Sequence, residues 1–177
     1  MKFTIKMLVI VLLAATNSTM AQSRWDIEID PLAYIFKGFS VHAGYQVERI
    51  RYDLGIFGLE EPEALHKQEN FRHRGIGAGV KADYLFKSYE GLFVGISISS
   101  ALHTYTYLPS NTDTQRFGLT SSVRTGYRFM IGRHFTIVPW GDVGYSLNNP
   151  DPVTVNDETF ATDRFKYFLT VHLGWKF

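Results

Sequence analysis

The chain ends with Arg164-Phe-Lys-Tyr-Phe-Leu-Thr-Val-His-Leu-Gly-Trp-Lys-Phe177, a stretch in which apolar and polar side chains alternate. A period of two indicates a β-strand, because successive side chains of a strand point to opposite faces. The pattern therefore predicts a C-terminal strand with one polar face and one apolar face. The apolar face consists of Phe165, Tyr167, Leu169, Val171, Leu173, Trp175 and Phe177.

The other end of the chain has the pattern of a secretory signal peptide. Two lysines precede an apolar run from Met7 to Ala15, and Thr19-Met-Ala21 offers small residues to a signal peptidase. The apolar run is shorter than the roughly 20 residues that a membrane-spanning helix needs. We expect residues 1–21 to be a signal peptide and residues 22–177 to form one exported domain.

The composition argues against several classes of function. The formal net charge of +1 becomes −1 without the two lysines of the signal peptide, so there is no general attraction for nucleic acid. The chain has no cysteine, which argues against a lipoprotein and against disulfides. A sheet that closes on itself can stabilise such a chain instead. The sequence contains no P-loop and no zinc-ligand cluster, and we expect no cofactor.

Alternating segments recur along the rest of the chain. The phase of the alternation changes between Val47 and Ile50, which a two-residue hairpin at Glu48-Arg49 would explain. A β-bulge would also explain it, and would leave seven strands. Bacterial barrels made of one chain have an even number of strands, so we predict eight. The predicted strands are residues 25–36, 38–47, 50–59, 75–87, 91–108, 115–130, 134–147 and 164–177.

Two prolines fall inside these predicted strands. Pro31 lies in the first strand and Pro139 in the seventh, where a closed barrel has no free edge for a residue without an N–H group. We therefore expect a local bulge at each proline. A bulge at Pro139 would move Trp140 and Asp142 to the other face of the sheet.

The connections between the predicted strands alternate in length. Residues 87–91 and 131–134 are short connections, whereas residues 60–74, 109–115 and 148–163 are longer and more polar. Outer-membrane barrels have short periplasmic turns and longer outer loops. We expect both termini on the periplasmic side and the long connections outside, the first of them with a short helical turn.

The polar face decides which side of the sheet is inside. It carries mainly glycine, serine and threonine, whereas the surface of a soluble barrel would carry many lysines and glutamates. Small residues suit the narrow interior of an eight-stranded barrel, which its own side chains fill. Aromatic residues also gather at both ends of the apolar face, as in the girdles at membrane interfaces. The sequence therefore predicts an all-β, eight-stranded antiparallel transmembrane barrel with up-and-down topology.

On these features, residues 24–177 resemble the OmpA/OmpX-type small outer-membrane barrels. The resemblance rests on the signal peptide, the strand alternation and the closing Leu173-Gly-Trp-Lys-Phe177. It implies integration in the outer membrane of a Gram-negative bacterium and contact with outer-membrane lipid and lipopolysaccharide. It also implies recognition of the C-terminal strand by the barrel-assembly machinery. It does not imply one activity, because one fold hosts many functions.

The charged side chains of the polar face are candidates for a network inside the barrel. Asp26, Glu28 and Asp30 of the first strand face the closing strand, so we expect them near Lys166, His172 and Lys176. Buried charges need partners, and we interpret the set as paired filling of the lumen rather than an ion path. The predicted network is Arg51, Asp53, Lys81, Asp83, Arg124, Arg128, Asp142, Lys166, His172 and Lys176.

Three other features could carry chemistry. His42, His103 and His172 share the lumen face, but their spacing matches no metal-ligand pattern. His103 lies near Ser110 and Asp113, but the His-x-Ser element of deacylase barrels is absent, so we expect no enzyme. The acidic connection at residues 148–163 lacks the oxygen spacing of a calcium loop and is interpreted as solvated.

The function expected from the sequence is that of a structural or surface-interaction protein acting through its outer loops. A small channel for ions or solutes is the first alternative, and a lipid-A-modifying enzyme is the second.

Overall fold

Strands make up most of the structure. The computed structural model describes residues 24–66, 68–148 and 151–177, so the signal peptide predicted for residues 1–21 lies outside the described residues. In these ranges no helix is both long and apolar enough to cross a membrane. The elements are β1 (Arg24–Ile29), α2 (Pro31–Ile35), β2 (Phe39–Val47), β3 (Ile50–Glu61), α3 (Glu63–His66), β4 (Phe71–Leu85), β5 (Gly91–Tyr107), β6 (Thr112–Ile131), β7 (Phe135–Ser146), β8 (Val153–Val155), β9 (Glu158–Phe160) and β10 (Phe165–Lys176).

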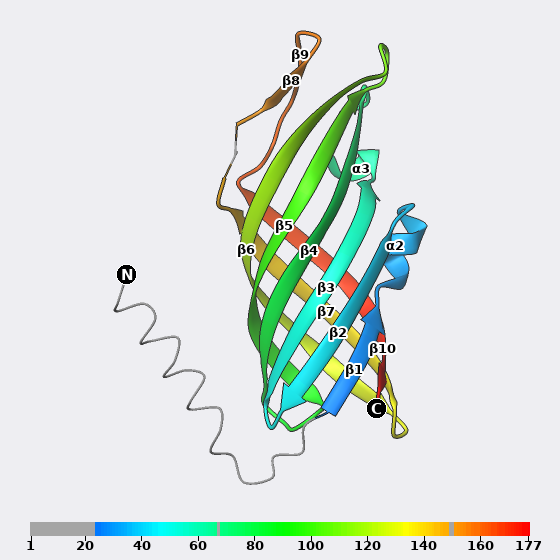
Figure 1. Ribbon diagram of the computed structural model, residues 1–177, viewed down its shortest axis with the longest axis vertical. Helices are drawn as coiled ribbons and strands as arrows, with labels where there is room; N and C mark the ends of the chain where they lie inside the picture. Colours follow the sequence, from blue (N-terminus) through cyan, green and yellow to red (C-terminus); the bar gives the residue numbers. More distant parts are fainter. Residues whose placement is uncertain (1–23, 67, 149–150) are drawn as a thin grey trace, which may run out of the picture.

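Eight of the strands form a closed barrel in the order β1-β10-β7-β6-β5-β4-β3-β2 (Figure 1). Every neighbouring pair is antiparallel. The predicted eight-stranded, up-and-down barrel is therefore confirmed. Strands β8 and β9 pair only with each other, as a hairpin within the connection between β7 and β10. We call the end of the barrel that carries the long connections the outer end, which is the top of Figure 1.

The change of phase after Val47 is a tight hairpin between β2 and β3. Val47 and Ile50 are direct cross-strand partners, as predicted. Glu48 has a φ of 54°, in the left-handed region that a residue with a Cβ atom rarely adopts. The side chain of Gln46 donates a hydrogen bond to the Glu48 carbonyl oxygen at 2.8 Å. This bond holds a turn that the Glu-Arg sequence does not favour by itself.

The predicted first strand, residues 25–36, is wrong in its second half. β1 ends at Ile29, and Pro31 opens the short helix α2 instead of forming a bulge. The Asp30 side chain accepts a hydrogen bond from the Leu32 N–H group at 2.9 Å and so caps this helix. Proline is favoured in the first turn of a helix, because its missing N–H group would have no helical partner there.

The bulge predicted at Pro139 is also wrong. β7 keeps one register with β10 from Tyr145 to Phe135. The pairing of β7 with β6 skips Pro139 and Val138 and resumes in the same register. Trp140 therefore keeps the lumen face, where it is buried.

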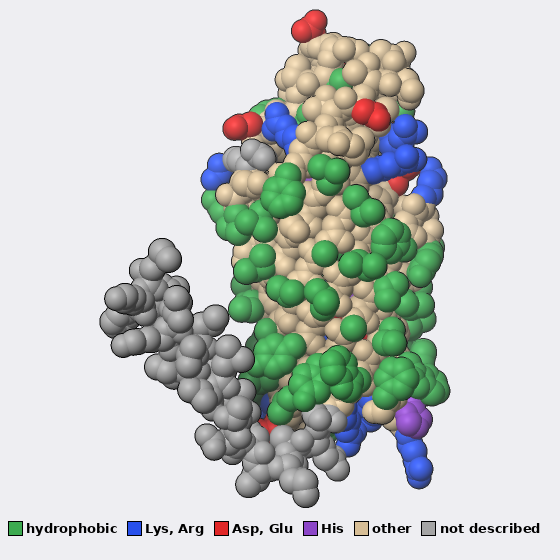
Figure 2. All heavy atoms as spheres, viewed as in Figure 1, with side chains coloured by type: hydrophobic (Ala, Val, Ile, Leu, Met, Phe, Trp, Pro, Cys, Tyr) green, Lys and Arg blue, Asp and Glu red, His purple; other side chains and the backbone are tan. Residues whose placement is uncertain are grey.

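The outer surface of the barrel is apolar and the interior is polar, the reverse of a soluble barrel. On β5 the outward side chains from Leu92 to Leu102 form an apolar band, and Figure 2 shows the apolar belt on the face in view. Ten residues of a strand tilted as in small barrels rise about 25 Å, the height of the apolar band of outer-membrane barrels. The belt is therefore the surface that faces lipid.

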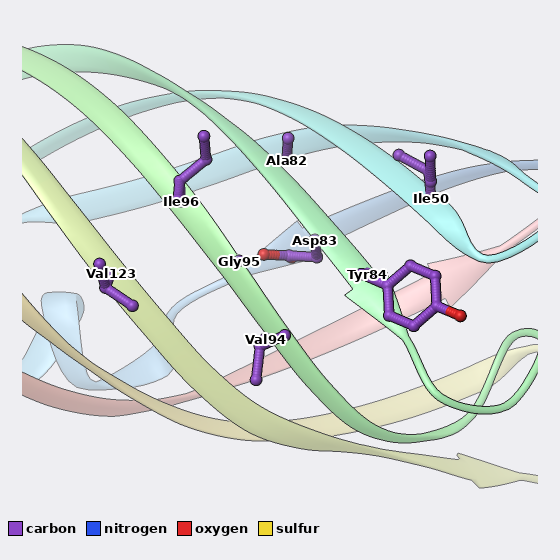
Figure 3. A pocket seen from close by; sticks show the side chains of 8 residues that line it. All are labelled: Ile50, Ala82, Asp83, Tyr84, Val94, Gly95, Ile96 and Val123. Atoms are coloured by element: carbon purple, nitrogen blue, oxygen red, sulfur yellow. The ribbon is translucent and has the colours of Figure 1, made fainter.

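A hollow lies in the belt, on the outer surface of β3 to β6 (Figure 3). The small side chain of Ala82 lies there among larger apolar neighbours that include Tyr84, Ile96 and Val123. Asp83 and Gly95 also line the hollow, because Gly95 has no side chain that would cover the barrel wall there. The hollow belongs to the lipid-facing surface.

Candidate functional site

A single arginine organises the charged side chains inside the barrel. Arg51, on β3, is 1% exposed. Its Nη2 and Nε atoms bind the two carboxylate oxygens of Asp26 at 2.6 and 3.0 Å. Its Nη1 atom lies 2.9 Å from Asp53 Oδ2, and its Nη2 atom lies 3.3 Å from Glu28 Oε1. One guanidinium thus lies within 3.3 Å of three buried carboxylates, and its planar set of N–H donors can bind them together; a fourth carboxylate, Asp83, lies 3.9 Å from Nη1.

Glu28, on β1, carries this network across the lumen. Its carboxylate pairs with Arg128 of β6. It also lies 2.9 Å from His172 Nδ1 of β10. Together with Arg51, these contacts join four strands, two of which lie on the far side of the barrel from β3. The inner half of the lumen is therefore spanned by ion pairs between strands that are not neighbours.

A second chain of hydrogen bonds runs along β2 and β3. Ser40 Oγ lies 2.9 Å from His42 Nε2, and His42 Nδ1 lies 2.9 Å from Asp53 Oδ1. Hydroxyl, imidazole and carboxylate follow one another in the order of a nucleophile, base and orienting acid. All three residues are buried, and Lys81 Nζ lies 3.1 Å from the same His42 nitrogen. The sequence interpretation missed this chain, whose signal is the Ser-x-His spacing on one strand face.

A third group lies on β4 to β7. Arg124 Nε lies 3.5 Å from Asp83 Oδ1, and its guanidinium carbon lies 4.1 Å from the centre of the Trp140 ring. A cation over an aromatic face is stabilised by the ring quadrupole. Asp142 accepts a hydrogen bond from Ser122 Oγ at 3.0 Å. This group fills the lumen beside the Arg51 network.

Glycines on neighbouring strands make room for these large side chains. A Cβ atom at Gly44 would meet the Arg51 guanidinium and the Asp26 carboxylate. A Cβ atom at Gly55 would meet the His42 ring. The mixture of glycines and charged residues on the polar face is therefore a packing requirement of a narrow lumen.

The predicted network divides into a buried set and two end residues. Lys166 is exposed at the outer end, and Lys176 lies at the inner end, 5.8 Å from the Tyr89 ring centre. The expectation that these lysines meet the acids of β1 is wrong, because Asp26 binds Arg51 although Lys176 is its register partner. The residues of the predicted network that do lie in the lumen are Arg51, Asp53, Lys81, Asp83, Arg124, Arg128, Asp142 and His172.

A cluster of titratable side chains closes the outer mouth above the apolar belt. Glu61 Oε2 lies 2.5 Å from His73 Nδ1, and His73 Nε2 lies 3.0 Å from His103 Nδ1. Burial raises the pKa of Glu61, but the hydrogen bond with His73 and the nearby charges of His73, His66 and Lys166 together hold that pKa below the ordinary value. Tyr105 stacks on His73, and burial raises the pKa of Tyr105 to about 12. The cluster thus presents a carboxylate and a neutral phenol.

The connection at residues 148–163 was expected to be solvated, and this is wrong for its β8–β9 hairpin. The hairpin packs on the outer ends of β4 and β5, and β4 begins at Phe71, four residues before the predicted strand 75–87. Arg116 Nη1 donates to the Asp151 carbonyl oxygen at 2.8 Å, and Asn156 Nδ2 donates to Ser110 Oγ at 2.6 Å. The hairpin is therefore held as a cap over the mouth. The hairpin also makes an apolar contact with the barrel. In it, Val153, Val155 and Phe160 of the hairpin pack against Phe71 of β4 and Tyr105 of β5.

The structure does not assemble the enzyme site considered for His103. His103 contacts His73, whereas Ser110 contacts Thr112 at 2.9 Å and Asn156. Among the hydrogen bonds of the described residues, none joins His103 to Ser110. Among all the residues that the structure describes, no group of three or more His, Cys, Asp or Glu side chains is arranged to hold a metal ion.

Comparisons with solved structures identify the fold. The N-terminal β-barrel domain of Pseudomonas aeruginosa OprF superposes with a TM-score of 0.57 at 13% identity, covering 89% of this chain and all of that domain. Neisserial surface protein A (NspA) superposes with a TM-score of 0.51 at 14% identity, covering 87% of this chain and 94% of that one. No protein-family model matches the sequence, and no curated protein sequence matches it. The resemblance to small OmpA/OmpX-type outer-membrane barrels is confirmed as a likeness of fold.

Proposed function

We propose that this chain is an integral outer-membrane protein whose lumen is sealed by its own side chains. Both termini are periplasmic, and the outer connections act as a structural or surface-interaction module. The observation that carries this proposal is the ion network centred on Arg51, in which the cation and its three carboxylates are all buried. An ion crossing the lumen would have to separate these pairs, and breaking a buried pair costs about 3–5 kcal/mol.

Purified protein in planar lipid bilayers is therefore expected to show no steady unitary currents. The matched comparison is a triple variant, Glu28→Ala, Arg51→Ala and Arg128→Ala, which removes the three charges that join opposite strands. If this variant inserts, it should conduct where the wild type does not. Steady unitary currents from wild-type protein would refute the sealed lumen and favour the small-channel alternative.

The outer rim supports contact with lipopolysaccharide. Lys37 and Arg74 flank Glu60, with Lys37 Nζ and Arg74 Nη2 each 2.8 Å from its carboxylate oxygens. These hydrogen bonds lower the pKa of Glu60. The three residues line a second hollow with apolar Ile76 and Leu102, toward the outer ends of β3 to β5. Two exposed cations at this height suit the phosphates of an anionic lipid.

We propose no catalytic activity, although Ser40, His42 and Asp53 have the contacts of a catalytic triad. Ser40 is 6% exposed, so a substrate carbonyl would have to displace its packing. His42 stacks on His172 at 4.7 Å, and Lys81 competes for the nitrogen that faces Asp53. The contacts among Ser40, His42 and Asp53 are better explained as a buried structural network, since buried polar groups need hydrogen-bond partners.

A fluorophosphonate probe of serine hydrolases is accordingly expected to leave the folded protein unlabelled. The test compares wild type with Ser40→Ala after reconstitution in lipid vesicles, with labelling detected on a gel. Equal and negligible signals would support a structural Ser40. Labelling of wild type that disappears in Ser40→Ala would establish a nucleophile and revive the lipid-modifying alternative.

A further inference from the structure

The strand pairing of the barrel is incomplete where the first and last strands meet. β10 pairs with β7 from Phe165 to Trp175, but with β1 only from Leu173 to Lys176. β1 ends at Ile29, and α2 continues the chain toward the outer end in place of a strand (Figure 1). The outer half of β10 therefore has a strand partner on one side only.

The exposure of Phe168 shows the consequence for the lumen. Phe168 lies opposite Asp142 in the register of β10 with β7, so it belongs to the lumen face. It is nevertheless 40% exposed, whereas Phe93, another lumen-face aromatic residue, is 2% exposed. Two residues further in, Thr170 is buried and donates a hydrogen bond to Asp30 at 2.8 Å. The break in strand pairing between β10 and α2 therefore leaves Phe168 uncovered above the Thr170–Asp30 contact, and we call this break the opening.

The borders of this opening face lipid. Tyr167 and Leu169, the outward neighbours of Phe168, are 78% and 80% exposed. On α2, Tyr34 and Ile35 are also largely exposed. The opening lies in the outer half of the span of β10 between Phe165 and Trp175, and therefore at the depth of the outer-leaflet acyl chains. Acyl chains are the molecules present at that depth.

We propose that the outer part of the lumen binds one lipid acyl chain, which enters sideways between β10 and α2. The Phe168 ring, 5.5 Å from the Trp140 ring centre, forms the apolar wall that receives the chain. Trp140 Nε1 is buried without a hydrogen-bond partner among the described residues, so it offers a donor to a lipid oxygen. Exposed Lys37 and Lys166 lie at the outer edges of the two walls, where they complement an anionic headgroup.

This binding site goes beyond the sealed-lumen function and does not depend on it. The Arg51 network closes the inner half of the lumen, and the β8–β9 cap packs on β4 and β5 at the mouth. The side opening is on the opposite wall, at β10. A lipid chain can therefore occupy the outer half in a barrel that conducts nothing.

The natural absence of cysteine allows a direct test by spin labelling. Single variants Phe168→Cys, Leu169→Cys and Val138→Cys are labelled in phosphatidylcholine vesicles, and their accessibility to oxygen and to a water-soluble nickel chelate is measured. Leu169 faces lipid and Val138 is buried in the lumen, so they define the two limits. We expect position 168 to match position 169, with oxygen accessibility several-fold above position 138 and little access for the chelate. High chelate access would mean a water-filled vestibule, and low access for both reagents a closed wall; either result overturns the proposal.

A second measurement keeps Phe168 in place. With Trp25 and Trp175 replaced by phenylalanine, Trp140 is the remaining tryptophan, and its fluorescence is compared in ordinary and dibrominated phosphatidylcholine. The control carries Phe93→Trp and Trp140→Phe in the same background, which moves the indole within one buried cluster. We expect bromine to quench Trp140 several-fold more than the control. Equal quenching would show that bromine acts only through the wall, and would overturn the proposal.

Discussion

Replacing Arg51 by alanine is expected to destabilise the barrel more than any other single change to a charged side chain. The variant leaves Asp26, Glu28 and Asp53 buried around an empty space: Asp26 loses both of its guanidinium hydrogen bonds, and Glu28 and Asp53 each lose one of their cationic partners. Removing one partner of a buried ion pair typically costs about 3–5 kcal/mol, because the other charge stays desolvated. The free energy of unfolding is to be measured by urea titration in lipid vesicles, followed by the gel migration of unboiled samples.

The matched control is Arg74→Ala at the outer rim. Arg74 also forms an ion pair with a glutamate, at 2.8 Å, but its side chain is 55% exposed. An exposed pair contributes about 0–1 kcal/mol, so this variant should unfold close to wild type. Equal losses in both variants would mean that the lumen is wet enough to screen Arg51, and would remove the main support for the sealed interior.

Much of the barrel could be predicted because its rules are local. Alternation of side chains follows from strand geometry, and the phase change after Val47 required a hairpin that the structure contains. The even strand number then followed from closure. The predicted strand ends were less accurate, because β4 begins at Phe71 and β6 at Thr112, beyond the apolar belt. Polar strand residues outside the membrane carry no apolar alternation to reveal them.

The pairing of charges could not be predicted to the same extent. The pattern placed Asp26, Glu28 and His172 on the lumen face, and there they lie. The partners of the acids depend on side-chain reach across the lumen, which alternation does not encode. The long side chain of Arg51 reaches Asp26 from two strands away. Lys176, the register partner of Asp26, lies at the inner end instead.

The helix α2 and the mouth cap were missed for a related reason. The sequence pattern predicts a β-bulge at Pro31, although the preceding Asp30 is a favourable N-cap residue for a helix. The Asp-Pro pair at the point where alternation stops was therefore the available signal for α2. The cap hairpin had a weaker signal, since Val153, Val155 and Phe160 are the apolar positions of an otherwise acidic connection.

Replacing Gly44 by valine is expected to lower the free energy of unfolding, because Gly44 lies against the ion pair of Arg51 with Asp26. A Cβ atom at this position would overlap the guanidinium of Arg51 and the carboxylate of Asp26, both buried. Because neither group can withdraw into solvent, the pair must separate, and we expect a loss of about 3–5 kcal/mol. Gly44→Ala should lie between wild type and valine, because overpacking increases with the added volume.

Ala43→Val is the matched control, since Ala43 is the preceding residue of β2 and faces lipid. It adds a branched side chain to the same strand on the opposite face, where β-branched residues are favoured, and should leave the unfolding free energy within about 1 kcal/mol of wild type. The same urea titration compares the three variants. If Gly44→Val unfolds with Ala43→Val, the interior has room beside Arg51, and the lumen is not packed as tightly as the ion network requires.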